Sequence, residues 1–444
     1  MSKHIDRRSF LGVTAAGIAA ASAGVAAAQT LSQGSIDGRP IRLGFVGVGD
    51  RGSHHLDAAL GIDGVEVPAI CDIDDAYLHR AKRWVEETGK PSPKLYGKTK
   101  TDFERMCAEE ELDCVICSTS WRWHTPVLLA AMRNGKHAVS EVPIALTLDE
   151  AWEIVETWEE TGKWGTLGLE GFRSLTVANM VWEGLLGDVI HAEAGYVHDL
   201  RLAKFDPERE PWRLAHSINK NGNLYPDHPM SAIMPALDIN HGDRFDSLVS
   251  MSSKAVSLNR FAAHYYGEEH PLATMEMKQG DYNVTLIRTV GGKLITLNFD
   301  TNTPHPRSFY RLQGSKGVYF GDRYTPSRNS LIYLEGVSPE EHSWEPAGPW
   351  LEKYQHPIER DYNPPRREAL RGHGGRASRT PLVWHRLVGA LNEKRLPDWD
   401  VYDSVTSSAI SALSQQSVAS GSRPVEFPDF TRGKWKDRPR WLSS

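Results

Sequence analysis

Cysteine, long apolar runs and an excess of positive charge are all scarce in this chain of 444 residues. Its four cysteines are too few to form the disulfide framework of a small secreted domain. Lys and Arg number 51 against 57 Asp and Glu, so the formal charge of −6 disfavours binding to nucleic acid or to an anionic membrane surface. With 40% hydrophobic and 24% charged residues, the composition indicates an ordinary globular protein of enzyme size.

The first 28 residues have the features of an export signal. Arg7-Arg8 precede Ser9–Leu11, and a weakly apolar Ala, Gly and Ser run ends at Ala26–Ala28. This is the twin-arginine pattern with a small-residue cleavage site. A short membrane anchor is the alternative, and the scarcity of Leu and Ile in the run disfavours it. We expect residues 1–28 to be removed and a mature chain without a membrane span to be exported folded, to the periplasm or outside the cell.

Residues 40–165 alternate short β-rich runs with helical patterns, which predicts a parallel α/β sheet in a first domain. The predicted strands are Ile41–Val48, Val65–Cys71, Cys114–Ser118 and His137–Ser140, and the predicted helices include Leu56–Leu60, Ala76–Glu87 and Val127–Asn134.

From about Val189 strand-like runs follow one another with few long helices between them, which predicts a large, mostly antiparallel open sheet. We expect an α+β substrate-binding domain over residues 166–395, and a C-terminal helix and tail over residues 396–444 that pack back on the body. Residues 338–380 lack periodicity and are interpreted as loop. The predicted strands are Val189–His198, Lys254–Leu258, Ala273–Lys278, Tyr282–Thr289, Lys293–Asp300 and Phe309–Gln313, and the predicted helices are Leu382–Leu391 and Ser404–Ala419.

A glycine-rich loop lies between the first predicted strand and the first predicted helix. Gly47, Gly49 and Gly52 form the pattern G-x-G-x-x-G, whose glycines allow a tight turn and close approach of the backbone to a pyrophosphate. Asp72 follows Gly52 by 20 residues, at the end of the second predicted strand, where a carboxylate binds both ribose hydroxyls and repels a 2′-phosphate. The spacing predicts an NAD-binding domain; the alternative is a glycine-rich turn with an incidental acid.

The four cysteines all fall in the first predicted domain. Cys114 and Cys117 have C-x-x-C spacing, but they lie on a predicted strand, where positions i and i+3 face opposite sides. No second Cys or His pair with ligand spacing accompanies them. We expect buried core thiols and no metal site.

Two further motifs give the chain a resemblance to a known superfamily. Ser118–His124 follows a predicted strand, and Gly135–Pro143 ends in Glu141-Val142-Pro143. With the glycine loop, they resemble the glucose-fructose oxidoreductase/inositol dehydrogenase superfamily, which pairs a Rossmann domain with an open antiparallel sheet that carries the sugar. In most dehydrogenases of that superfamily a lysine stands at the position of Val142 and assists proton removal, so the valine disfavours a plain alcohol dehydrogenase.

A narrower resemblance, to glycoside hydrolase family 109, accounts for Val142 and covers nearly all of the mature chain in order. Its most specific element is the Tyr-Pro-x-His block on a loop after an Asn-Gly turn. The matching segments are Trp121–His124, Glu141-Val142, Gly195–Arg201, Trp212-Arg213, Asn221–His228, Asp238–Arg244, Gln313–Gly317 and the tail from Asp400 through Phe430.

Members of that family are NAD-dependent α-N-acetylgalactosaminidases, so the resemblance implies bound NAD and a glycan or other small-molecule substrate. It implies transient oxidation at C3 of the sugar, removal of the C2 proton, elimination of the aglycone, addition of water and return of the hydride. Such enzymes are exceptions to hydrolysis by paired carboxylates.

The resemblance assigns the chemistry to His228 and Tyr225. An imidazole titrates near the working pH, and a phenol can donate to a developing alkoxide or enolate. Which of the two handles the C3 hydroxyl and which the C2 proton stays open. The implied sugar-binding residues are Tyr196, Arg213, Tyr225, Pro226, Asp227 and His228. The implied NAD-binding residues are Gly47, Gly49, Asp50, Arg51, Gly52, Asp72, Trp121, Arg122, Trp123, His124, Glu141 and Val142.

Two departures from the family pattern bear on the substrate. Phe172 stands in the segment Leu169–Arg173 where the family usually has a tyrosine. A second sugar-contacting tyrosine is replaced around Pro306–Ser308, and Tyr310 is its nearest substitute. We therefore expect that substrate preference can differ from N-acetylgalactosamine.

Two other function classes remain as alternatives. The first is a periplasmic NAD(P)-dependent sugar oxidoreductase that shuttles hydride between two sugars, and Val142 argues against it. The second is a non-catalytic sugar- or nucleotide-binding protein, which the glycine loop, Tyr225 and His228 argue against. Open sheets of this superfamily often pack against a partner, so a homo-oligomer is expected by fold analogy alone.

Overall fold

The structure is a computed structural model that describes residues 35–170, 175–207, 209–306, 309–322, 330–364, 367–368, 377–378 and 381–442. The predicted export signal, Phe172 and the Arg307-Ser308 pair lie outside the described residues. The described residues form one compact unit. Within the described ranges, no helix is both long and apolar enough to cross a lipid bilayer.

The first sheet is parallel, as the alternating pattern predicts, except for a short first strand. Its order is β4-β3-β2-β5-β6-β7, and β1 pairs antiparallel with β2. Every residue of β5 is buried, which is typical of a parallel strand covered on both faces. The strands are β1 (Ser35–Ile36), β2 (Arg39–Val46), β3 (Val65–Cys71), β4 (Lys94–Tyr96), β5 (Cys114–Cys117), β6 (His137–Ser140) and β7 (Gly165–Thr166).

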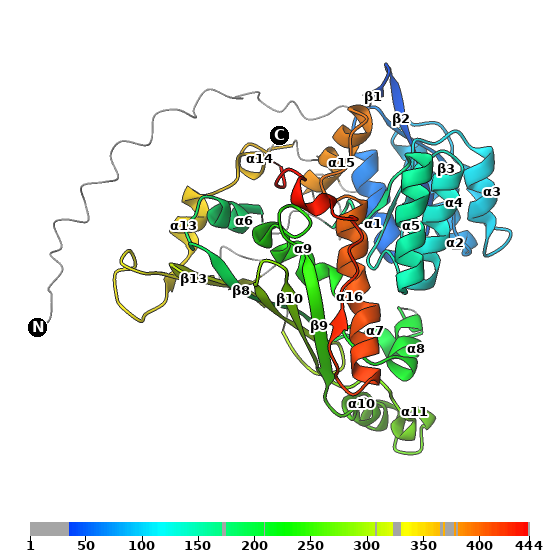
Figure 1. The fold of residues 1–444 in the computed structure, drawn as a ribbon. Coiled ribbons are helices and arrows are strands. Elements are labelled where there is room, and N and C mark those ends of the chain that lie inside the picture. The colour runs from blue at the N-terminus through cyan, green and yellow to red at the C-terminus, as the bar shows by residue number, and fades with distance from the viewer. Residues whose placement is uncertain are drawn as a thin grey trace, which may run out of the picture. The chain divides into compact units, whose positions relative to one another are not determined.

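Helices with well-defined ends connect these strands (Figure 1). The Asp74 side chain caps α2 by accepting from the N–H groups of Ala76 and Tyr77, and Thr147 and Glu150 form a capping box at α5. The predicted helix at residues 56–60 is only the second half of α1, because the glycine loop obscures its first turn. The elements are α1 (Asp50–Leu60), α2 (Asp75–Glu87), α3 (Asp102–Glu109), η1 (Trp121–Trp123), α4 (His124–Arg133) and α5 (Leu148–Thr161).

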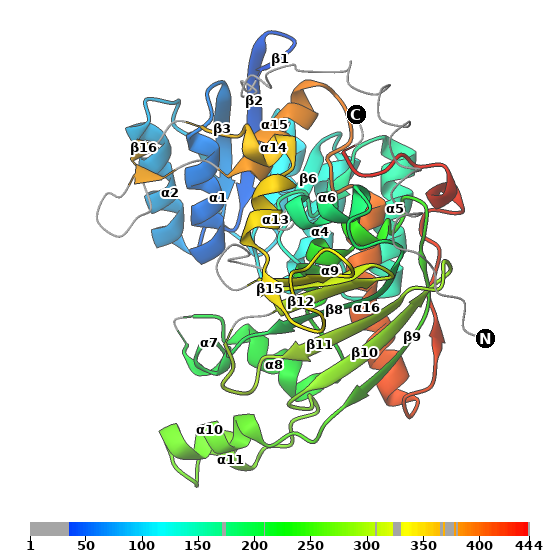
Figure 2. The same cartoon turned by 90° about the vertical axis from the view of Figure 1, so that its left-hand side faces the viewer.

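The second sheet is mostly antiparallel, as predicted, and has nine strands among the described residues (Figure 2). Its order is β15-β14-β13-β12-β8-β11-β10-β9-β18, with a parallel pairing between β8 and β11. The strands are β8 (Val189–Val197), β9 (Phe245–Ser252), β10 (Asn283–Thr289), β11 (Leu294–Asp300), β12 (Phe309–Gly314), β13 (Gly317–Asp322), β14 (Leu331–Leu334), β15 (Glu345–Pro346) and β18 (Val425–Glu426).

Two strand predictions in this half are wrong. Residues 254–258 lead into helix α10 (Ser257–Tyr266), and residues 273–278 overlap and follow α11 (Pro271–Thr274). Short apolar runs do not distinguish strand from helix by periodicity. Strand β9 was not predicted, because a register shift in its pairing with β10 leaves Phe245 and Leu248, three residues apart, both buried.

Long-range contacts join the C-terminal helix α16 to both sheets. It contacts α5 beside the first sheet and β9 of the second sheet. Residues 338–380 were interpreted as loop, yet their described part contains two short helices. The remaining elements are α6 (Leu175–Trp182), α7 (Arg201–Phe205), α8 (Trp212–Asn219), α9 (Asp227–Ile233), η2 (Pro235–Leu237), α13 (Gly348–Lys353), α14 (Pro357–Arg360), β16 (Arg367–Glu368), β17 (Ala377–Ser378), α15 (Leu382–Asn392), α16 (Val401–Ala419) and η3 (Lys434–Lys436).

Candidate functional site

The glycine loop between β2 and α1 is closed against neighbouring backbone. Gly47 has a φ of 83°, and a Cβ there would lie 2.8 Å from the carbonyl of Ser118. A Cβ on Gly52 would lie 1.9 Å from the carbonyl oxygen of Gly47, whereas a Cβ on Gly49 would meet only the ring of Tyr77, at 3.3 Å. Gly47 and Gly52 are therefore required by the turn itself, and Gly49 leaves room for a ligand against the backbone.

Asp72 lies beside this loop, at the carboxyl end of β3. Its Oδ2 accepts a hydrogen bond of 2.7 Å from the Val48 N–H, and its Oδ1 accepts one of 3.0 Å from the Asp74 N–H. Burial raises the pKa of Asp72, and the N–H groups of Val48 and Asp74 oppose that shift. Loop and carboxylate together have the geometry that holds the pyrophosphate and the ribose of a dinucleotide, so these residues fit NAD.

The His124 side chain lies between the two motif segments that follow β5 and β6 and is hydrogen bonded to both. Its Nδ1 lies 2.7 Å from the carbonyl oxygen of Pro143, and its Nε2 lies 3.0 Å from that of Thr119. Burial lowers the pKa of His124. Because both ring nitrogens face protein carbonyls, His124 acts on the site by fixing these segments. Its neighbour Arg122 stacks on the ring of Trp123 at 5.3 Å.

Glu141 is held by two basic side chains of α1, whose first residue is Asp50. Its Oε1 lies 2.6 Å from Nε2 of His55 and 3.5 Å from Nε of Arg51. Burial would raise the pKa of Glu141, but the hydrogen bond from His55 and the charges of His55 and Arg51 lower it to about 2. The carboxylate is therefore ionised at neutral pH, next to the buried Val142.

The structure brings Trp121 of the first half against Tyr225 of the second, and Tyr225 in turn contacts Tyr196 and His228. Trp121 stacks on Tyr225 with ring centroids 5.0 Å apart, and Tyr196 stacks on His228 at 5.2 Å. Tyr225 meets Tyr196 and His228 edge-on, at 4.5 and 4.7 Å. Trp121, one of the predicted cofactor-binding residues, thus forms one aromatic cluster with Tyr196 and the predicted catalytic pair.

Arg213 completes this cluster from α8. Its guanidinium lies 5.3 Å from the ring of Trp121 and 5.3 Å from that of Tyr225. Two hydrogen bonds to Glu210, of 2.8 and 3.0 Å, hold it there. Burial raises the pKa of Tyr225 well above its ordinary value, against the opposing charge of Arg213. Tyr225 therefore keeps its proton at neutral pH and can donate a hydrogen bond.

Glu170 is a site residue that the sequence reasoning did not select. Its Oε1 lies 2.7 Å from Nδ1 of His228 and accepts a hydrogen bond of 3.2 Å from Ser231. The side chains of His228 and Glu170 are only 12% and 7% exposed. A buried carboxylate of this kind fixes the tautomer and orientation of an imidazole. The sequence held one signal for it: Glu170 lies in the segment Leu169–Arg173, where the family usually has a tyrosine at the position of Phe172.

Asp227 reaches away from the aromatic cluster toward α16. It is completely buried, and its Oδ1 accepts hydrogen bonds of 2.5 and 2.6 Å from the hydroxyls of Ser407 and Ser408. Burial raises the pKa of Asp227 to about 7, although the two hydroxyls oppose the shift. Its side chain therefore anchors the loop that carries Tyr225, Pro226 and His228.

Replacing Asp227 with asparagine is expected to change how stability depends on pH. The folded protein keeps the Asp227 proton up to about pH 7, whereas the unfolded chain loses it near the ordinary pKa of 3.8. The Asp227 contribution to the free energy of unfolding therefore falls from pH 4 to pH 7, by on the order of 4 kcal/mol. In Asp227→Asn that decline should be absent, so the free energy of unfolding of the variant should rise relative to that of the parent chain as pH increases.

Urea unfolding at pH 4.5 and pH 8 measures this difference. A gap between variant and parent that stays constant with pH would contradict the assignment of a buried, protonated Asp227.

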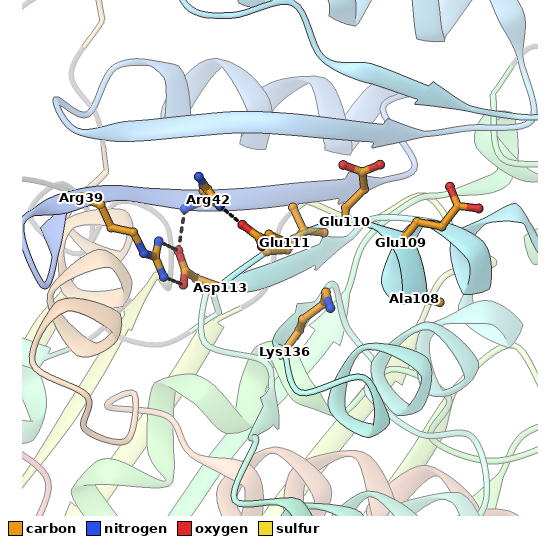
Figure 3. A pocket seen from close by; sticks show the side chains of 9 residues that line it. Arg39, Arg42, Ala108, Glu109, Glu110, Glu111, Asp113 and Lys136 are labelled. Carbon is orange, nitrogen blue, oxygen red and sulfur yellow. Dashed lines mark hydrogen bonds and ion pairs between the residues drawn. The ribbon is translucent and has the colours of Figure 1, made fainter.

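A pocket of about 410 Å³ lies beside the first sheet, on the side away from the glycine loop (Figure 3). Both arginines of its lining are paired with carboxylates: Arg39 donates to Asp113 at 2.6 Å, and Arg42 donates to Glu111 at 2.6 Å. Ligands of parallel sheets bind at the carboxyl ends of the strands, and this pocket is at the amino ends. It is therefore separate from the candidate site. Its lining residues are Arg39, Arg42, Ala108, Glu109, Glu110, Glu111, Leu112, Asp113 and Lys136.

All four cysteines are buried without a disulfide bond, as expected for core thiols. Burial raises the pKa of Cys107 to about 12 and that of Cys117 to about 11, so neither is a nucleophile at neutral pH. In the part of the chain that the structure describes, no group of three or more His, Cys, Asp or Glu side chains is placed to bind a metal.

Comparison with known proteins decides the family. The model of "Glycosyl hydrolase 109, C-terminal domain" matches residues 172–437, and that of the oxidoreductase family with an NAD-binding Rossmann fold matches residues 41–168. The chain belongs to glycosyl hydrolase family 109. As a family 109 protein it is an enzyme, a glycoside hydrolase with NAD as its cofactor.

Relatives across this family are similar over most of their length. A glycosyl hydrolase family 109 protein of Shewanella pealeana is 37% identical over 456 residues, which cover 97% of each chain. A protein of Shewanella oneidensis named alpha-N-acetylgalactosaminidase is 37% identical over 404 residues, 89% of this chain and 86% of that one. Among solved structures, levoglucosan dehydrogenase in complex with NADH and L-sorbose has a TM-score of 0.65 at 17% identity, covering 88% of this chain and 100% of that one. The fold class predicted from the sequence is thus confirmed.

Proposed function

We propose that this family 109 enzyme cleaves α-N-acetylgalactosaminides or closely related glycosides and keeps its NAD through the catalytic cycle. The observation that carries the proposal is the cluster in which Tyr225 and His228, with Glu170 behind the imidazole, meet Trp121 of the NAD-binding half. The name of the Shewanella oneidensis relative supports the class of substrate.

The cofactor would be held by the glycine loop, by Asp72 and by the segments 121–124 and 141–142. When bound, NAD accepts a hydride from C3 of the sugar and returns that hydride at the end of the cycle. Glu141 stays anionic beside Arg51 and His55, which keeps the first turn of α1 and the end of β6 together. The protein contributes orientation and electrostatics, and the redox chemistry belongs to the cofactor.

A ketone at C3 makes the proton on C2 acidic, because the resulting negative charge spreads onto the carbonyl oxygen. Removal of that proton forms a C1–C2 double bond and breaks the bond from C1 to the glycosidic oxygen, which leaves with the aglycone. Water then adds at C1, a proton returns to C2, and reduction at C3 restores the sugar. The net reaction is hydrolysis with no net oxidation.

We infer that His228 and Tyr225 move the protons of this sequence. With Nδ1 of His228 against Glu170, Nε2 is the ring nitrogen that exchanges a proton with the sugar. Tyr225 remains protonated, so its hydroxyl stabilises the oxygen at which negative charge develops. Arg213 and Tyr196, which line the same cluster, would bind the sugar.

Turnover of an aryl α-N-acetylgalactosaminide in D₂O, with no NAD added, tests the proposal. The expected result is release of the aglycone together with deuterium at C2 of the freed sugar. Release without C2 deuterium would mean either direct hydrolysis or elimination in which the base returns the same, shielded proton to C2. No release, while the denatured protein still yields NAD, would contradict the substrate class. Accumulation of oxidised sugar would instead favour the sugar oxidoreductase.

We also propose that residues 1–28 are a twin-arginine export signal and that the enzyme works in the periplasm or outside the cell. Arg7-Arg8 and the Ala-rich run that follows support this. Fusing residues 1–28 to a reporter that is exported only when folded tests it. A Lys-Lys replacement of Arg7-Arg8 should abolish export, and unchanged export would contradict the proposal.

A further inference from the structure

Buried serines occupy one face of the C-terminal helix α16. Apart from the adjacent pair Ser407-Ser408 they recur every three residues, so neighbouring serines lie on the same side of the helix. A buried hydroxyl is costly unless it is hydrogen bonded, and most of these hydroxyls bond to other parts of the chain. The serines are Ser404, Ser407, Ser408, Ser411, Ser414 and Ser417, and none is more than 3% exposed.

Three of these serines accept hydrogen bonds from backbone N–H groups just outside the site motifs. Ser408 accepts from Ile144, two residues after Val142, at 3.0 Å. Ser404 accepts from Leu167, three residues before Glu170, at 2.9 Å. Ser414 accepts from Asn223, two residues before Tyr225, at 2.8 Å. Helix α16 thus holds the cofactor segment, the Glu170 segment and the catalytic loop on one scaffold. The donor residues are Ile144, Leu167 and Asn223.

Ser408 is the point at which two of these segments meet. Its hydroxyl accepts from the Ile144 N–H and donates to Oδ1 of Asp227 at 2.6 Å. Ser407 donates to the same oxygen at 2.5 Å, so the carboxyl is held by two adjacent residues of α16. Asp227 immediately precedes His228 in the first turn of α9.

We infer that Asp227 and Ser408 are positioning residues that couple the catalytic segment 225–228 to the cofactor segment 141–144. The inference rests on the proposed function and deepens it. A shift of Asp227 moves Tyr225 and His228 relative to Glu141 and Val142, and misplacement of reacting groups by about 1 Å costs on the order of a hundredfold in rate. Neither residue needs to touch the sugar or the cofactor to act in this way.

Ser411 provides a matched control on the same face of the helix. Its hydroxyl accepts a hydrogen bond from Gln415 of the same helix, at 3.4 Å. Ser411→Ala therefore deletes a buried hydroxyl of α16 while leaving both site segments bonded. Ser408→Ala deletes an equivalent hydroxyl, removes the acceptor of the Ile144 N–H and leaves Asp227 bonded to Ser407 alone, so the link between the two segments is broken.

The deciding experiment is hydrogen–deuterium exchange, read by mass spectrometry, on protein stripped of cofactor and then supplied with NAD⁺. In the parent chain and in Ser411→Ala, NAD⁺ should slow exchange in peptides covering both 141–146 and 223–230. In Ser408→Ala the slowing in 141–146 should persist, whereas that in 223–230 should be clearly smaller than in Ser411→Ala, because the Ser408 link is lost while the Trp121–Tyr225 stack still joins the two halves. Equal protection of 223–230 in Ser408→Ala and Ser411→Ala would overturn the inference.

Turnover supplies the second readout. We expect kcat to fall at least about tenfold in Ser408→Ala and in Asp227→Ala, with little change in KM, and Asp227→Asn to recover most of the loss because its amide oxygen still accepts from both serines. An equal loss in Ser411→Ala would overturn the inference. The exchange experiment uses no glycoside. Loss of coupling in Ser408→Ala, with no glycoside cleavage by the parent chain, would therefore uphold the inference and reject the proposed function.

Discussion

Replacing His228 with glutamine should lower kcat by about 10² to 10⁴, the usual contribution of a positioned acid–base group. Glutamine retains a hydrogen-bond donor toward Glu170 but cannot exchange a proton near neutral pH. The NAD content and the unfolding temperature should stay close to those of the parent chain, because His228 is one residue of a cluster that also contains Trp121 and Tyr196. Steady-state turnover of an aryl glycoside measures the effect.

Glu170→Gln is the companion variant that tests how Glu170 positions His228. The amide still reaches Nδ1 but carries no charge to stabilise the imidazolium that forms when His228 takes up a proton. We therefore expect kcat to drop by less than in His228→Gln, with KM little changed. A His228→Gln enzyme with more than a tenth of the parent kcat would contradict the assigned role.

Gly52→Ala should all but eliminate NAD binding and also destabilise the fold. Its Cβ would lie 1.9 Å from the carbonyl oxygen of Gly47, which is backbone and cannot rotate away. The turn would have to open, and with it the hydrogen bond from the Val48 N–H to Asp72. The NAD released on denaturation and the unfolding temperature should therefore both fall.

Gly49→Ala separates the loss of NAD binding from the loss of fold stability. Its Cβ meets the Tyr77 ring at 3.3 Å, and that side chain can move by the few tenths of an ångström required. The variant should therefore fold with a nearly unchanged unfolding temperature and yet bind NAD more weakly, because the methyl group occupies space beside the pyrophosphate. Retention of NAD by Gly52→Ala would show that the loop does not form the dinucleotide site.

Local sequence patterns were enough to predict the central strands of the first sheet and the kind of site that they carry. Strand β3 begins and ends at the predicted residues, and Asp72 lies beside the glycine loop as its spacing predicted. These features are local. A hydrophobic period of two or 3.6 residues, or a turn that only glycine can form, can be recognised from a short stretch of sequence. The same local reasoning misassigned residues 254–258 and 273–278, where runs of five or six residues fit either element.

Which groups lie together in the site depends on tertiary packing and could not be predicted from local patterns. Glu170 and His228 are 58 residues apart, and Ile144 and Ser408 are 264 apart, yet both pairs are hydrogen bonded. Nothing in the local pattern of either partner encodes the other, because such pairs form when whole elements pack.

In the sequence, the serines of α16 look like the polar face of an ordinary helix. In the structure they are buried. A buried hydroxyl needs a hydrogen-bond partner, and the partners of Ser404, Ser408 and Ser414 include backbone groups beside the site.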